Sequence, residues 1–170
     1  KVLGAPAAWV KANPNAARAL IGAVLDASRW IDNPKNRPLV AKLISDKSYV
    51  NAPEEVIAGR FLGQYEDGLG RKWQDKHAMA FFRDGQTNFP YLSDGMWFLT
   101  QHTRWGLLTT DPAYLGVAKQ INQIDLYKQA ASMARVPVPK SLMRTSKLID
   151  GKVWDGKDPK AYAASFAIRA

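Results

Sequence analysis

The feature that most constrains this fold is a recurring pair, a polar residue followed by proline. The pair stands at the start of segments whose apolar residues have helical spacing. Pro14 follows Asn13, Pro38 follows a polar break, and Pro112 follows Asp111. Proline is tolerated in the first turn of a helix and breaks a helix interior, and a preceding Asn or Asp can cap the helix. The chain is therefore expected to form several short helices that begin near prolines.

The longest helix is expected from Trp9 to Ile31, with Asn13 as a cap and Pro14 in the first helical position, because apolar residues recur there every three or four positions. Further helices are expected over residues 38–44, 54–61, 93–108, 112–121, 125–133 and 159–166. On the helix that begins at Ser93, one face is expected to carry Trp97, Phe98, Gln101, Arg104, Trp105 and Leu108. Trp97 and Phe98 are expected to point inward.

Extended structure is expected in few places. Residues 63–70 contain three glycines and are interpreted as a loop. Residues 79–82 and 87–90, which flank Arg83–Gln86, are interpreted as a hairpin or as a pair of short extended segments. Lys152–Trp154 is a candidate strand. The sequence thus predicts a mainly α chain with a few short β strands, and its length of 170 residues favours one unit spanning residues 1–170.

The net charge of +9 comes from 24 basic and 15 acidic residues, and it is spread evenly along the chain. Residues 1–85 carry 13 basic and 9 acidic groups, and residues 86–170 carry 11 and 6. Nucleic-acid binders usually gather basic residues into one arm, stripe or helix. The charge therefore indicates a basic surface with mild attraction for anions, and no nucleic acid is expected as a partner.

Several kinds of reactive site are excluded by residue type or spacing. The chain has no cysteine, which rules out disulfides, thiolate zinc sites and a cysteine nucleophile. His77 and His102 lack a partner at the spacing by which one helix grips a metal, and no Gly-rich phosphate loop or Gly-x-Ser-x-Gly motif occurs. No catalytic residue, metal or cofactor is therefore expected, and the chain is not expected to be an enzyme.

A bilayer span is not expected either. A membrane-spanning helix needs about 18 or more consecutive apolar residues, and no stretch of this sequence reaches that length. The protein is thus not expected to be transmembrane.

The stretch from Phe81 to Gly106 is the most distinctive part of the sequence. An aromatic segment turns at Asn88-Phe89-Pro90 onto a helix capped by Ser93. One face of this helix carries Trp97, Gln101 and Arg104. Guanidinium and amide donors suit a planar oxyanion, so these three residues are candidate ligand contacts, although an arginine on an aromatic helix is more often a structural ion-pair or stacking residue.

The skeleton Phe-x-x-Gly-x-x-Asn-Phe-Pro, Ser-Asp-Gly-x-Trp-Phe and Arg-Trp-Gly within this stretch resembles the nitrate- and bicarbonate-binding proteins of bacterial ABC transporters. The resemblance extends to Lys1–Gly4 and Asn13–Asn15, to residues 114–131, and to Asp158–Tyr162. It implies the C-terminal portion of a two-lobe α/β periplasmic-binding-protein fold of type II, and therefore an incomplete C-terminal fragment of a larger solute-binding protein.

The function implied by this resemblance is capture of a small oxyanion, nitrate before bicarbonate, by lobe closure. The implied partners are the anion, an ABC permease and a missing N-terminal portion, which is expected to hold the main ligand residues. The implied location is periplasmic, or anchored outside the inner membrane. Three alternatives stay open: a cytoplasmic nitrate sensor of the same fold, a helical nucleic-acid-binding domain and, least favoured, an enzyme of this fold such as a pyrimidine-precursor synthase.

Overall fold

The computed structural model describes residues 2–168 and is mainly helical over them. Its helices are α1 (Ala7–Ala12), α2 (Pro14–Asp32), α3 (Arg37–Ser45), α4 (Glu54–Phe61), α5 (Leu92–Arg104), α6 (Tyr114–Ile121), α7 (Ile124–Met133) and α8 (Pro159–Ala164). Its strands are β1 (Gln64–Glu66), β2 (Lys72–Gln74), β3 (Ser146–Lys147) and β4 (Val153–Trp154). β1 pairs with β2 and β3 with β4, both antiparallel. The predicted mixture of many helices and few short strands is confirmed.

Proline marks several helix starts as the sequence predicted. α2 begins at Pro14 and α8 at Pro159, and the Asp158 carboxylate accepts the Ala161 N–H at 2.9 Å. The predicted cap by the Asn13 side chain is wrong. That amide instead donates to the Trp9 carbonyl at 3.0 Å, closing α1, so the single helix expected from Trp9 to Ile31 is divided at Asn13.

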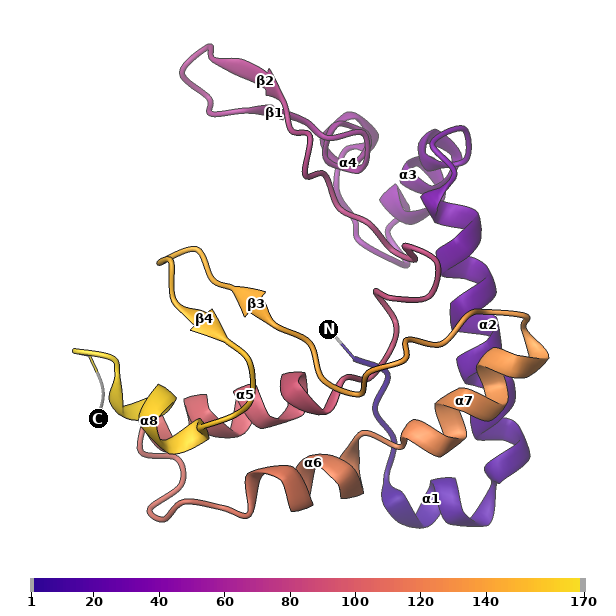
Figure 1. Cartoon of the computed structure of the whole chain (residues 1–170). Helices are drawn as coiled ribbons and strands as arrows, with labels where there is room; N and C mark the ends of the chain where they lie inside the picture. The colour runs from indigo at the N-terminus through magenta and orange to yellow at the C-terminus, as the bar shows by residue number, and fades with distance from the viewer. Residues whose placement is uncertain (1, 169–170) are drawn as a thin grey trace.

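One hydrophobic core joins α2 to α7. The two helices lie side by side and contact each other directly (Figure 1), and side chains of the segment before α5 join the same core. The Phe89 ring meets Tyr91 and Tyr127 edge-on, with centroids 4.8 and 5.4 Å apart. The buried members of this core are Leu25, Phe82, Phe89, Tyr91, Tyr127, Ala131 and Val136.

A second core lies among α5, α6, α8 and strand β4. Its buried members are Leu92, Met96, Tyr114, Ala118, Trp154, Tyr162 and Phe166. The Trp154 indole N–H donates to the Ser93 carbonyl at 2.8 Å, so the β3–β4 hairpin is fixed to the first turn of α5. Since Tyr91 and Leu92 are adjacent but belong to different cores, α5 begins where the two cores meet.

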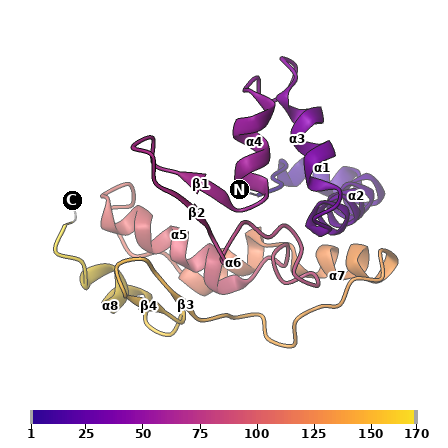
Figure 2. The same ribbon diagram turned by 90° about the horizontal axis from the view of Figure 1, so that it is seen from above.

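Helices α3 and α4 and the β1–β2 hairpin form an arm that projects from the end of α2 (Figure 1). Turned by 90°, the chain from α7 to β4 runs along the side away from α3 and α4 (Figure 2). The Asp32–Arg37 pair fixes the base of the arm. Arg37 donates to Asp32 at 3.2 Å and to the carbonyls of Phe61 and Met79, which lie beyond α3.

Two predictions about extended structure are wrong. The segment interpreted as a glycine loop, residues 63–70, contains strand β1 and most of the turn to β2, in which the Asp67 carboxylate accepts the N–H groups of Leu69 and Arg71. Tyr65 and Trp73 then stack across the strands, with ring centroids 5.9 Å apart. The hairpin expected within residues 79–90 is absent from the described chain, because the N–H groups of residues 81–83 bind the Asp32 carboxylate instead.

Candidate functional site

The N-terminus of α5 is held by side chains from two later segments. The Asn122 amide donates to the carbonyls of Pro90 and Tyr91 at 3.2 and 2.8 Å. The Arg144 guanidinium makes two hydrogen bonds to the Asp94 carboxylate, at 2.9 and 2.6 Å. Paired bonds of this kind fix orientation as well as distance. The side chains farther along α5 are consequently presented in a defined direction.

The three candidate residues from the sequence follow one another along α5, and the structure brings two of them into direct contact. The Arg104 guanidinium donates to the Gln101 side-chain oxygen at 3.3 Å. The Trp97 indole N–H instead donates to the hydroxyl of Tyr162, on α8, at 3.1 Å. All three side chains are half-buried. They form a polar row beside α8 that remains partly open to solvent.

Arg104 is also the contact between α5 and the end of the described chain. Its Nε donates to the carbonyl of Ile168 at 2.9 Å. The guanidinium carbon lies 3.9 Å from the Phe166 ring centroid and 4.5 Å from that of Trp105, which is cation–π geometry. Arginine carries five N–H donors. The structural contacts of Arg104 therefore leave donors on the same guanidinium that could meet an anion.

The face of α5 that enters the core differs from the predicted one. Phe98, which was expected to face inward, is 54% exposed, and Trp105, which was expected on the same face, is 48% exposed. The buried positions are instead Leu92, Ser93, Met96 and Thr100, in which Met96 follows Leu92 by four residues and Ser93 by three, and Thr100 follows Met96 by four. Phe98 lies two residues beyond Met96, about 200° around the helix, which places it on the opposite side.

Behind the polar row, a chain of hydroxyl and carboxylate groups joins α5, α6 and α8. The Tyr114 O–H donates to Asp111 at 2.7 Å, and the Tyr114 and Thr103 hydroxyls are 3.1 Å apart. The Tyr114 hydrogen bond and the Lys160 ammonium, 3.3 Å away, lower the pKa of Asp111. Burial, with the Asp111 charge, raises the pKa of Tyr114. Both groups thus keep their ordinary charge states at neutral pH and act structurally.

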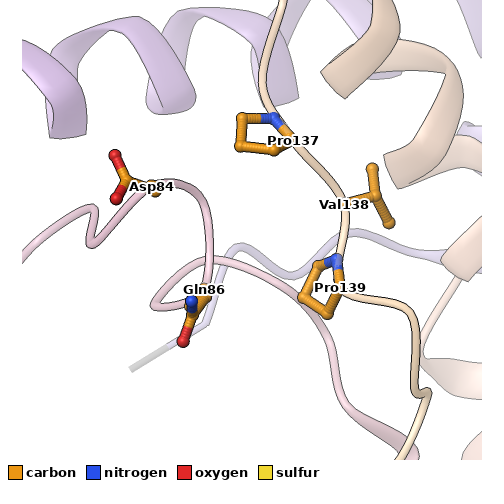
Figure 3. A pocket seen from close by; sticks show the side chains of 5 residues that line it. All are labelled: Asp84, Gln86, Pro137, Val138 and Pro139. Atoms are coloured by element: carbon orange, nitrogen blue, oxygen red, sulfur yellow. The ribbon is translucent and has the colours of Figure 1, made fainter.

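An open pocket between the turn before α5 and the segment after α7 was missed by the sequence analysis (Figure 3). It is lined by Asp84, Gln86, Pro137, Val138 and Pro139. Asp84 and Gly85 adopt positive φ angles of 53° and 81°, and a Cβ added at Gly85 would lie 2.5 Å from a Val136 methyl carbon. The two segments are about fifty residues apart. The sequence placed a turn at Arg83–Gln86, but no local signal predicts its contact with Pro137–Pro139.

Metal and proton-transfer chemistry find little support in this arrangement. Among residues 2–168, no group of three or more His, Asp or Glu side chains could hold a metal ion. His77 and His102 are both exposed, as expected for solvated histidines. What the polar row offers is hydrogen-bond donors on the Gln101 amide and the Arg104 guanidinium, because the single indole N–H of Trp97 is already donated to Tyr162. Such donors bind anions without reacting with them.

Comparison with known proteins gives a consistent group of relatives. A model of the NMT1-like family matches residues 1–45. The nitrate/nitrite binding protein NrtA of Nostoc sp. PCC 7120 is 36% identical over 166 residues, which is 95% of this chain and 38% of that protein. The bicarbonate-binding protein CmpA of Synechococcus elongatus PCC 7942 is 28% identical, with 95% of this chain and 38% of that protein covered.

A solved structure agrees with these relatives. The crystal structure of the periplasmic nitrate-binding protein NrtA from Synechocystis PCC 6803 superposes with a TM-score of 0.87 and 31% identity, covering 96% of this chain and 43% of that one. Over nearly its whole length the chain is therefore similar to a segment of these anion-binding proteins. The resemblance and the fold class expected from the sequence are both confirmed. These relatives are binding proteins rather than enzymes, and the chain spans less than half of their length.

A third kind of relative carries a different name. The nitrate import ATP-binding protein NrtC of Synechococcus elongatus PCC 7942 is 31% identical over 171 residues, covering 100% of this chain and 25% of that protein. The homologous segment therefore occurs in proteins named for anion binding and in a protein named for ATP binding. No helix within the described part of this chain is long and apolar enough to cross a bilayer.

Proposed function

We propose that this chain is part of the solute-binding component of an ABC transporter for a small oxyanion, nitrate in the first place and bicarbonate in the second. One observation carries the proposal: 96% of the chain superposes on a periplasmic nitrate-binding protein with a TM-score of 0.87 at 31% identity. The bicarbonate-binding relative supports the same ligand class and is the reason why bicarbonate is proposed as the second anion.

In this proposal residues 1–170 form one unit, which is the C-terminal portion of a larger solute-binding protein. The main ligand residues precede this unit. Ligand contacts would stabilise a closed arrangement of two lobes and shift an existing equilibrium toward it. The candidates within this chain stay Trp97, Gln101 and Arg104. Their support is the donor-rich, partly open row on α5, in which Arg104 and Gln101 are already hydrogen-bonded to each other.

The proposed location and partners follow from the transporter assignment. A periplasmic location, or anchoring outside the inner membrane, is supported by the periplasmic nitrate-binding homologue. An ABC permease would receive the anion, and the NrtC relative supports a link to a nitrate importer. No nucleic acid is proposed as a partner, because the positive charge is spread over both halves of the sequence.

A second candidate function is an anion-sensing module on the cytoplasmic side of a transporter. The observation that favours it is the match of the whole chain to a nitrate import ATP-binding protein. The fold and ligand class would be the same, but the bound anion would signal to a partner instead of being delivered. Whether an export signal precedes this segment in the natural gene product separates the two candidates.

Calorimetric titration tests the proposal. The natural-length product of the gene that encodes this chain should bind nitrate saturably, with bicarbonate as the competing anion. The isolated 170 residues should give no saturable heat with either anion, because the main ligand residues are placed outside them. Micromolar binding by the isolated chain would move the site into this segment, and absence of nitrate or bicarbonate binding by the natural-length protein would refute the proposed function.

A further inference from the structure

Helix α2 carries a second apolar face that nothing in the described chain covers. Its first face enters the core through Ala17, Ile21 and Leu25. The second face is exposed throughout and consists of Ala16, Leu20, Ala23, Val24 and Ala27. We refer to these five residues as the outer stripe of α2. Leu20 is 49% exposed and Val24 41%.

The outer stripe has the geometry of a packed helix face. Its members recur at spacings of three and four residues and include no charged or polar side chain. At 1.5 Å per residue the stripe is about 17 Å long, and at 100° per residue it is about 100° wide, which is the width of an ordinary core-facing stripe. Its three alanines would let the backbone of another element approach closely.

Charged groups on α2 lie on a separate strip and leave the outer stripe clear. Asp26 and Arg29 form a weak pair, with a charged-atom distance of 4.0 Å, and Arg18 donates to Gln129 on α7 at 2.8 Å. A helix that is apolar on two sides and polar on a narrow third strip is typical of an element sandwiched between two layers. The described chain supplies one of these layers, namely α7 and the segment before α5.

The observations also indicate what the second layer is. This chain covers 43% of the homologous nitrate-binding structure, so more than half of such a protein lies outside it. The NMT1-like family match covers residues 1–45, which contain α1, α2 and α3. The outer stripe thus lies in the segment that is shared with the family.

We infer that the outer stripe of α2 packs against the polypeptide that the longer homologues carry beyond the matched segment, so that α2 becomes an internal helix joining this unit to the ligand-holding lobes. This inference rests on the proposed function, which places the chain in a longer binding protein. The inference adds to that function the surface through which this unit contacts the rest of the binding protein.

The absence of cysteine makes thiol accessibility a direct test. Val24→Cys places a thiol in the outer stripe, and Asp26→Cys places one on the polar strip of the same helix as a matched control. In the isolated 170 residues, iodoacetamide should alkylate both thiols readily. In the natural-length gene product, alkylation of Val24→Cys should be at least tenfold slower, whereas the rate for Asp26→Cys should change little.

Three results would overturn the inference. Equal rates for Val24→Cys in the two proteins would show that the stripe stays exposed. Protection of both thiols would show general burial of α2 rather than use of one face. Protection in the isolated chain that increases with protein concentration would assign the stripe to a second copy. Since no anion enters the assay, failure here leaves the proposed function intact, and failure of the nitrate titration leaves this result standing.

Discussion

Removal of the Asp32 carboxylate is expected to destabilise the chain more than loss of any ordinary surface charge. One carboxylate oxygen accepts the Phe81 N–H at 2.7 Å and the Arg37 guanidinium at 3.2 Å. The other accepts the N–H groups of Phe82 and Arg83 at 2.8 and 3.0 Å. The side chains of Asp32 and Arg37 are only 20% and 12% exposed. Asp32→Ala thus leaves three backbone donors and a largely buried cation without their partner.

The expected magnitude follows from these contacts. Breaking a buried ion pair by removing one partner costs about 3–5 kcal/mol. A buried N–H group left without an acceptor costs about 1–3 kcal/mol. We therefore expect Asp32→Ala to lower the free energy of unfolding by about 3–4 kcal/mol, a little below the upper limit because both side chains keep some contact with water.

Urea unfolding followed by circular dichroism and tryptophan fluorescence measures this change. Asp46→Ala is the matched control, since Asp46 also accepts a backbone N–H, from Ser48 at 2.8 Å, but at an exposed site. We expect a much smaller effect there. Equal effects of Asp32→Ala and Asp46→Ala would refute the reasoning, because burial and multiplicity of contacts would then not matter. Asp32→Asn, which keeps the shape and one acceptor, should fall between the alanine variant and the unsubstituted chain.

Three further results are expected. Burial raises the pKa of the Asp32 carboxyl, but the backbone N–H groups and the Arg37 charge lower it more, to below 3.8. The stability advantage over Asp32→Asn should consequently be constant above about pH 5 and disappear as the pH falls below 3.8; an advantage that grows on acidification would contradict this sign. Trp97→Ala should lower the free energy of unfolding by about 2–3 kcal/mol, less than the substitution of a fully buried tryptophan, whereas Phe98→Ala should change the thermal midpoint little. A larger effect of Phe98→Ala than of Trp97→Ala would mean that Phe98, not Trp97, faces the core. Gly85→Ala should destabilise the chain strongly, because its φ is +81° and the new Cβ would meet Val136 at 2.5 Å, and an unchanged urea midpoint would show that the turn can shift at no cost.

The helices were largely determined by the local sequence. Apolar spacing and proline positions predicted α4, α7 and α8 close to their observed bounds, and the C-terminal end of α2, because a proline or an Asx residue acts within one turn of its own position. Without any structure, the even charge distribution argued against nucleic-acid binding, and the lack of cysteine excluded disulfides, thiolate zinc sites and a cysteine nucleophile. The central motif pointed to the anion-binding homologues, whose segment this chain matches at 31% identity and a TM-score of 0.87.

The tertiary structure decided what local signals could not encode. Residues 79–90 have the composition of a hairpin, but the Asp32 carboxylate, about fifty residues earlier, takes the N–H groups that a strand would need. The pocket beside Asp84 likewise requires the Pro137–Pro139 segment to return to that turn. Which face of α5 is buried depended on where α6 and α8 dock, and periodicity alone does not give the direction of the core. These features depend on contacts between residues that are far apart in the sequence. Such contacts form only when the chain folds, so local sequence patterns do not predict them.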